Sequence, residues 1–250
     1  MCLVWVRQRR LCSTRIIKIR TSLARGFFFE IVNSFAIMTA MKDYELYLFD
    51  FDGTLVDSHK SLIDVFVLSF RAIGIEIDEN NVRRYMRIPL EETYAEVNAP
   101  WDKADEFEKA IRFYLNDLEV LKKTEIYSDT IYFLKALRDK NKKFGIVTSN
   151  NEKHVIDVLN LFNIPPEWFC IYVDSDKVRE TKPSPKPLLY ALEELGYMDN
   201  KDKVVYIGDG MNDMVSANRS GVDAILVDRL DEYSESEAYY RIHDFFDILK

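Results

Sequence analysis

Short apolar runs alternate along most of the chain with longer stretches in which apolar residues recur every three or four positions. The runs predict buried strands, and the recurring spacing predicts helices with one buried face. Strands that alternate with helices form a parallel sheet covered on both faces. The predicted strands are residues 44–49, 143–150, 169–176, 204–210 and 224–228. The predicted helices are residues 61–73, 80–87, 90–97, 102–121, 130–140, 152–161, 187–195 and 212–220, with one more at the end of the chain.

The helical stretches that follow the first strand have no strands among them. Gly74 is suited to end the first of these helices, and Pro89 and Pro100 separate later ones. This pattern predicts a separate helical unit inserted after the first strand. We therefore expect an α/β fold with a Rossmann-like parallel sheet core of residues 41–59 and 126–250, and an inserted all-helical cap of residues 60–125.

The first 40 residues differ in composition from the rest of the chain. They carry seven basic side chains and one acidic side chain, Glu30. An Arg-rich, acid-poor and apolar segment is typical of a mitochondrial transit peptide. The alternative, which we favour, is that translation starts at Met38 or Met41. The segment contains no apolar run long enough for a transmembrane helix, and we expect residues 1–40 to lie outside the fold.

Composition and charge narrow the class of protein. An apolar fraction of 48% and a charged fraction of 30% are typical of a soluble globular chain. The net charge of −8 argues against a nucleic-acid partner or a membrane surface, although a local site can still bind an anion. Only Cys170 lies after residue 40, so this part cannot form an internal disulfide. A reducing compartment follows, and we expect the protein to be cytoplasmic.

Polar residues collect where the predicted strands end. Taken alone, Asp50 and Asp52 could reflect turn chemistry, because Asp-Gly is common in turns. Ligands of open parallel sheets, however, bind beyond the carboxyl ends of the strands, and four separate segments bring polar residues to that edge. These residues are Asp50 and Asp52 after the first strand, Thr148 and Ser149 after the second, Lys182 in a proline-rich loop, and Asp209 and Asp213 after the fourth.

The charges in this group predict a cation and an anionic ligand. Four carboxylates at one edge would repel one another strongly without a cation. Mg²⁺ fits, because it binds through a few carboxylates and completes its shell with water and phosphate oxygens. The three histidines are scattered and show no zinc-ligand spacing. Lys182 can neutralise phosphate charge, and Thr148 and Ser149 can donate hydrogen bonds to the same anion.

The motifs resemble those of a known family. The sequence DFDGTLVDS at 50–58 resembles the first motif of the haloacid dehalogenase (HAD) superfamily nearly letter for letter. Thr148 is similar to the second motif, Lys182 to the third, and GDGMND at 208–213 to the fourth. The resemblance spans roughly residues 44–228 in the correct order. The chain looks like the phosphatase branch, and its spacing leaves room for a helical cap, as in the phosphoglycolate-phosphatase-like group.

The resemblance implies a reaction and a role for each motif residue. Asp50 would attack phosphorus and form an aspartyl-phosphate, and Asp52 would act as general acid and base. The implied activity is Mg²⁺-dependent hydrolysis of a small phosphorylated metabolite. The implied phosphate-binding residues are Thr148, Ser149 and Lys182, and the implied metal ligands are Asp50, the backbone carbonyl of Asp52, and Asp209, with Asp213 close by.

Three departures from the family pattern leave the substrate open. Asn150 stands where many relatives have Lys, Gly210 where Ser is commoner, and Arg87 where Gly is frequent. Arg83, Arg84 and Arg87 have two interpretations. They could bind a carboxylate or second phosphate of the substrate, or they could form the solvated face of a helix.

Two other functions remain as alternatives. Sugar phosphomutases of this fold carry a His twelve residues after the nucleophile, where this chain has Leu62, so the pattern favours a hydrolase over a phosphotransferase. A non-catalytic phosphate-binding protein would be expected to lack the nucleophile, which is present here. The acidic stretch 231–237 is predicted to be a solvated linker. The sequence leaves a monomer and a homodimer equally open.

Overall fold

A computed structural model of the chain describes residues 42–86, 88, 90–233 and 240–249. The chain from Asp43 to Lys250 forms one compact unit. Residues 1–41, Arg87, Pro89 and most of the acidic stretch 231–237 lie outside the described part, so the expectations for them stay predictions.

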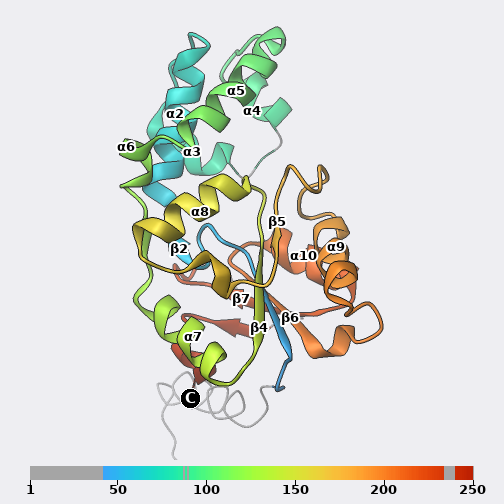
Figure 1. Cartoon of the computed structure of the whole chain (residues 1–250). Helices are drawn as coiled ribbons and strands as arrows, with labels where there is room; N and C mark the ends of the chain where they lie inside the picture. The colour runs from blue at the N-terminus through green and yellow to red at the C-terminus, as the bar shows by residue number, and fades with distance from the viewer. Residues whose placement is uncertain (1–41, 87, 89, 234–239, 250) are drawn as a thin grey trace, which may run out of the picture. The chain divides into compact units, whose positions relative to one another are not determined.

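Six parallel strands form the central sheet in the order β5-β4-β1-β6-β7-β8 (Figure 1). β1 lies in the middle and pairs with β4 on one side and β6 on the other. Helices cover both faces of the sheet, so the predicted fold class is confirmed. The strands are β1 (Leu46–Phe49), β4 (Lys143–Val147), β5 (Tyr172–Val173), β6 (Val204–Gly208), β7 (Asp223–Val227) and β8 (Tyr240–Ile242).

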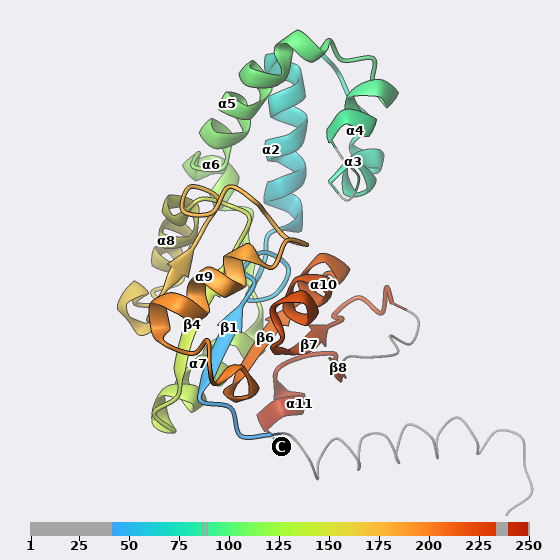
Figure 2. The ribbon, with the colours of Figure 1, turned by 90° about the vertical axis from the view of Figure 1, so that its right-hand side faces the viewer.

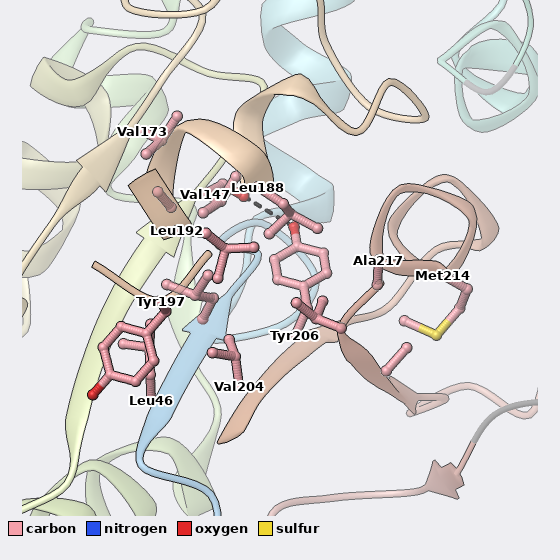
Figure 3. Close-up of a cluster of buried hydrophobic side chains, with 14 of the residues drawn as sticks. Leu46, Val147, Val173, Leu188, Leu192, Tyr197, Val204, Tyr206, Met214 and Ala217 are labelled. Carbon is pink, nitrogen blue, oxygen red and sulfur yellow. Dashed lines mark hydrogen bonds between the residues drawn. The ribbon is translucent and has the colours of Figure 1, made fainter. Parts of the chain in front are cut away.

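The two faces of the sheet bury alternate residues of β1, as the period of two requires. Leu46 and Leu48 belong to an apolar cluster with α9 (Lys186–Leu195) and α10 (Met211–Ser220) (Figure 3). Figure 2 turns the side with these two helices toward the viewer. On the opposite face, the rings of Tyr47 and Phe49 pack edge-on against Phe133 of helix α7 (Ser128–Asp139) at 6.1 and 6.0 Å between centroids. The remaining α-helices of the core are α8 (Glu152–Leu161) and α11 (Phe246–Leu249).

Five α-helices between β2 (Val56–Asp57) and β3 (Glu125–Ile126) lie above the sheet (Figures 1 and 2), and they contain two apolar clusters of their own. The chain enters and leaves them through these two strands, which form a short antiparallel pair. Aromatic residues such as Phe70, Tyr94 and Phe107 form their core. No helix in the described part of the chain combines the length and apolarity that a bilayer crossing needs. These inserted helices are α2 (His59–Ala72), α3 (Glu79–Tyr85), α4 (Leu90–Glu96), α5 (Ala104–Tyr114) and α6 (Leu118–Leu121).

The prediction of one helix over residues 102–121 was wrong. α5 ends at Tyr114, and α6 begins after Asp117, whose carboxylate accepts a hydrogen bond from the backbone N–H of Glu119 at 2.8 Å. Asp is a strong N-cap residue, so it starts a new helix although the apolar spacing continues. The break leaves the carbonyl of Leu115 at the end of α5, where the helix supplies no partner for it.

The strand predicted over 169–176 is much shorter, and three short strands, β2, β3 and β8, were missed. Asp174 ends β5 because its carboxylate accepts hydrogen bonds from the backbone of Glu152 and Lys177, at 2.8 and 2.9 Å. These bonds turn the chain away from the sheet. β8 pairs with β7 at the sheet edge. It has only three residues, too few to show the alternation of apolar and polar positions that marks a strand.

Candidate active site

Three neighbouring strands deliver their following residues to one edge of the sheet. Asp50 follows β1, Thr148 follows β4 and Asp209 follows β6. Phe49 lies in register with Ile207, and the backbone N–H of Asp50 still donates to the Ile207 carbonyl at 2.8 Å. The ladder therefore fixes the backbone of Asp50 directly beside the end of β6.

A tight turn after Asp50 brings Thr54 to Asp209. Gly53 has a φ of +82°, which favours glycine, and its N–H donates to the Val56 carbonyl at 2.8 Å. A Cβ atom at Gly53 would overlap the carboxylate of Asp209. The hydroxyl of Thr54 donates to Oδ1 of Asp209 at 3.1 Å. The glycine therefore serves both the turn and the close approach of two segments.

Three carboxylates form a compact cluster at this edge. Asp50, Asp209 and Asp213 each offer an oxygen, and these oxygens lie within 4.8 Å of one another. Asp213 lies on the first turn of α10, and a Cβ at Gly208 would overlap its side chain. The backbone N–H of Gly210 donates to Asp213 at 3.0 Å. Three convergent carboxylates suit a hard divalent cation, so this cluster could hold a metal ion.

Lys182 connects two of these carboxylates. Its ammonium donates to Oδ1 of Asp50 at 2.5 Å and to Oδ1 of Asp213 at 2.7 Å. It also lies 2.9 Å from the hydroxyl of Tyr206, which is 3.0 Å from the carbonyl oxygen of Val147 (Figure 3). Tyr206 was missed by the sequence analysis, because a tyrosine inside a buried strand reads as a core residue.

Asp52 lies apart from the carboxylate cluster and has its own partners. The side-chain amide of Asn150 donates to Oδ2 of Asp52 at 2.5 Å. Nε2 of His154, on the first turn of α8, lies 3.4 Å from Oδ1. Neither partner was predicted. Asn150 stood out as a departure two residues after Thr148, whereas nothing in the pattern around His154 marked it as a site residue.

Thr148 and Ser149 lie in different surroundings. Thr148 is buried, and its hydroxyl accepts a hydrogen bond from the backbone of Asn150 at 3.1 Å. Ser149 is exposed and lines a cavity of about 610 Å³ together with Arg112 and Arg179. The structure thus brings Thr148 to the end of β4 in a fixed conformation, while Ser149 faces a wider opening.

A cavity of about 150 Å³ opens between the sheet edge and the inserted helices. Asp52 and Asp209 line it from the core, and Arg83 and Met86 line it from α3 and its end. Arg84, the neighbour of Arg83, instead donates to Glu96 at 2.8 Å. The two arginines therefore differ: Arg83 faces the cavity, and Arg84 forms an ion pair within the inserted helices.

The family model for haloacid dehalogenase-like hydrolases matches residues 47–227. This range holds every motif residue of the site. The chain belongs to this family.

Relatives of this HAD-like hydrolase carry phosphatase names. It is 31% identical over 183 residues to a phosphoglycolate phosphatase of Aquifex aeolicus, covering 72% of this chain and 82% of the relative. It is 28% identical over 208 residues to a putative pyrophosphatase PpaX of Caldanaerobacter subterraneus, covering 81% and 92%. The crystal structure of a putative phosphatase from Clostridium difficile is similar with a TM-score of 0.67 and 28% identity, covering 84% of this chain and all of that one.

The carboxylate cluster of this HAD-like hydrolase favours bound positive charge. Burial raises the pKa of Asp50 well above its ordinary value; Lys182 opposes this, and Asp213 and Asp209 add to it. Burial and Asp213 likewise raise the pKa of Asp209 to about 6. Burial lowers the pKa of Lys182, but Asp213 and Asp50 outweigh it and raise that pKa well above its usual range. One ammonium does not neutralise three carboxylates, which is consistent with a metal site.

In the pair of Asp52 and His154, unlike in the carboxylate cluster, the charge and hydrogen bond of the neighbour outweigh burial in setting the carboxyl pKa. Burial raises the pKa of Asp52, but the charge and hydrogen bond of His154 outweigh it and leave that pKa below its ordinary value. Burial lowers the pKa of His154, and the Asp52 carboxylate outweighs it in turn, so the pKa of the imidazole is raised. The two groups therefore stabilise each other as an ion pair.

Proposed function

We propose that this hydrolase is a Mg²⁺-dependent phosphatase that cleaves a small phosphate monoester through an aspartyl-phosphate on Asp50. The observation that carries the proposal is the contact of the Lys182 ammonium with Asp50 and Asp213, beside Asp209. Phosphoryl transfer needs positioning and positive charge around three phosphate oxygens, and this arrangement offers both.

In the first step, an oxygen of Asp50 attacks phosphorus, and the bond between phosphorus and the ester oxygen breaks. The leaving alkoxide takes a proton from Asp52, which acts as general acid. Asp52 is suited to this role because it lines the cavity beside the carboxylate cluster without belonging to it.

In the second step, water attacks the phosphorus of the aspartyl-phosphate. Asp52, now ionised, takes a proton from that water, and the bond between phosphorus and Asp50 breaks. Inorganic phosphate leaves, and both carboxyl groups return to their starting states. The lowered pKa of Asp52 suits the second role, because a general base must be ionised to accept a proton, whereas the first role requires the protonated carboxyl group.

The remaining motif residues would hold the phosphoryl group and the cation. Asp50, the backbone carbonyl of Asp52, and Asp209 would bind Mg²⁺, with Asp213 close by. Bound Mg²⁺ supplies positive charge that keeps Asp50 ionised and neutralises phosphate oxygens. Lys182, Thr148 and Ser149 would bind the phosphoryl oxygens. Tyr206, which contacts Lys182, would keep the ammonium aimed at Asp50.

The inserted helices would act as a cap over the site, with residues 60–125 as the cap and residues 41–59 and 126–250 as the core. Their own apolar clusters support this division, because such a unit can move as one body. The relatives named phosphoglycolate phosphatase and pyrophosphatase suggest substrates with a second anionic group. Arg83, which lines the cavity from α3, is placed to contact such a group.

The test is phosphate release by the full-length chain from a panel of small esters, with and without Mg²⁺. The panel contains 2-phosphoglycolate, pyrophosphate, several sugar phosphates and p-nitrophenyl phosphate. We expect Mg²⁺-dependent release that is abolished in Asp50→Asn and retained in Lys186→Met, a surface control on α9. Rapid acid quench followed by mass spectrometry should find one phosphoryl group on the peptide that contains Asp50.

Three results would contradict the proposal in different ways. Release that survives in Asp50→Asn would remove the nucleophile. Conversion of a sugar phosphate into its positional isomer, without free phosphate, would indicate a phosphomutase. A folded, Mg²⁺-binding protein that consumes no ester of the panel would indicate a binding role.

A further inference from the structure

His154 is a buried titratable residue that the proposed reaction does not use. Its side chain is 1% exposed, on the first turn of α8. The ring packs edge-on against Phe51 at 6.2 Å between centroids, and the backbone N–H of His154 donates to the side chain of Asn151 at 2.9 Å. The backbone bond holds the start of α8, the packing on Phe51 holds the ring, and its two nitrogens face different parts of the protein.

One nitrogen faces the group that we propose as general acid and base. Nε2 lies 3.4 Å from Oδ1 of Asp52, and Asn150 donates to the other carboxylate oxygen at 2.5 Å. Both oxygens of Asp52 therefore have a partner from the segment that follows β4. Such a carboxylate has little freedom to rotate.

The other nitrogen faces the inserted helices. Nδ1 lies 2.9 Å from the carbonyl oxygen of Leu115, at the end of α5. A carbonyl oxygen only accepts hydrogen bonds, so Nδ1 carries the hydrogen. The carbonyl lies where α5 has ended and supplies no partner of its own. The break between α5 and α6 thus creates an acceptor that the imidazole fills.

We propose that His154 is a positioning residue that orients the carboxyl group of Asp52 and ties it to the end of α5. This inference rests on the proposed function, because Asp52 must be the proton donor for its orientation to matter. The ring does not touch the substrate and acts only through Asp52. Because His154 also bonds to Leu115 at the end of α5, the position of the inserted helices influences the orientation of Asp52.

The alternative is a purely structural role, in which His154 only supplies a hydrogen-bond donor to the buried carbonyl of Leu115. In that case its loss would weaken folding and slow every substrate alike. A positioning role makes a different demand, because only proton donation to the leaving group depends on the angle of Asp52. An alkoxide needs that proton, whereas p-nitrophenolate leaves readily without it. The dependence on the leaving group therefore separates the two explanations.

The experiment measures leaving-group release in the first turnover by the full-length protein with Mg²⁺. The substrates are 2-phosphoglycolate and p-nitrophenyl phosphate, and the variants are His154→Leu and His154→Gln. Val158→Ala, which shortens another fully buried side chain of α8, is the packing control. Asp52→Asn provides the reference for complete loss of the proton donor.

We expect His154→Leu to slow release of the alkyl leaving group about 10- to 100-fold, with KM little changed, and the aryl leaving group less than about threefold. His154→Gln, whose amide can reach one partner but not both, should give the same pattern at smaller size and serves where the Leu variant does not fold. Val158→Ala should show no dependence on the leaving group.

Equal slowing of both substrates, or no slowing of either, would overturn the positioning role and leave the proposed function standing. If Asp52→Asn shows no dependence on the leaving group while His154→Leu does, the role belongs to another group than Asp52. Wild-type protein that releases neither leaving group would instead overturn the proposed function, and this inference with it.

Discussion

The two walls of the cavity beside Asp52 differ in how firmly their charges are held. On the core side, Asp209 lines the cavity, and in the carboxylate cluster next to it the side chains of Asp50, Lys182 and Asp213 are buried and joined by hydrogen bonds of 2.5 and 2.7 Å. On the side of the inserted helices, the Arg83 side chain is 53% exposed, and Glu232 lies 4.0 Å away. The charges on the core side are held in a single geometry, whereas Arg83 is exposed and pairs with Glu232 only at long distance.

This difference separates chemistry from selectivity. Buried charges that hydrogen-bond to one another are already in place before the reaction, so little energy is spent on reorganising them. Such preorganisation is the main source of electrostatic catalysis. An exposed arginine contributes little until a ligand removes water from it, and then its planar donors suit carboxylates and phosphates. We therefore expect changes on the core wall to alter the reaction with every substrate, and changes on the other wall to alter the choice among them.

Replacing Lys182 with Met tests the core wall most severely. The change leaves Asp50 and Asp213 buried without their cation, and it removes positive charge from the phosphoryl site. We expect kcat/KM to fall about 10³-fold or more on every substrate, and the free energy of unfolding without metal to fall by about 3 kcal/mol. Steady-state kinetics and urea unfolding measure both. Lys186→Met is the matched surface control, and a loss below about tenfold in the Lys182 variant would contradict the division of roles.

Replacing Asp209 with Asn tests whether the core wall is built for a cation. A carboxyl whose pKa is raised on folding stabilises the fold below its unfolded pKa near 4, and this contribution is lost as the pH rises through the folded pKa of about 6. Without metal, Asp209→Asn should therefore be more stable than wild type by about 2 kcal/mol at about pH 7.5, and nearly equal to it at about pH 4.

Urea unfolding across this pH range measures the effect, with the exposed Asp202→Asn as control. Added Mg²⁺ should stabilise the wild type and reverse the order of the two proteins, because the variant has lost a ligand. A variant that is less stable at every pH would show that the Asp209 charge is already compensated by the protein.

Replacing Arg83 and Arg84 separately sharpens the contrast at the other wall. Arg83→Ala should raise KM about tenfold for 2-phosphoglycolate and leave KM for p-nitrophenyl phosphate unchanged, because only the former carries a second anionic group. Arg84→Ala should change neither, since Arg84 bonds to Glu96. Equal effects of the two substitutions would mean that neither arginine selects the substrate.

The core wall was largely predictable from the sequence, for a topological reason. Parallel strands end at one edge, so residues such as Asp50, Thr148 and Asp209 must lie close together once the strands are recognised. Glycines such as Gly53 also mark the short segments that follow the strands, because two segments of the chain approach closely there. Local pattern and global topology agree here, and the prediction needs no knowledge of side-chain packing.

The contacts across the two parts were not predictable, because they depend on where elements end and meet. His154 reads as one polar residue in a helix, and its role appears only when Leu115 and Asp52 are found on either side of it. The end of α5 was itself missed, since apolar spacing continued past Asp117. A cap residue overrode the helical pattern, and the acceptor for His154 arose from that break.

The smallest expected effect concerns a second bond between α5 and the core, at the surface. Arg112 donates to Asp176, after β5, at 2.8 Å, and both side chains are about half exposed. Solvent screens such a pair, so a double-mutant cycle with Arg112→Ala and Asp176→Ala should give a coupling below about 1 kcal/mol that fades at high salt. The buried bond from His154 to Leu115 should then be the stronger tie. A coupling above about 2 kcal/mol that persists in salt would reverse this ranking and place the main tie at the surface, away from Asp52.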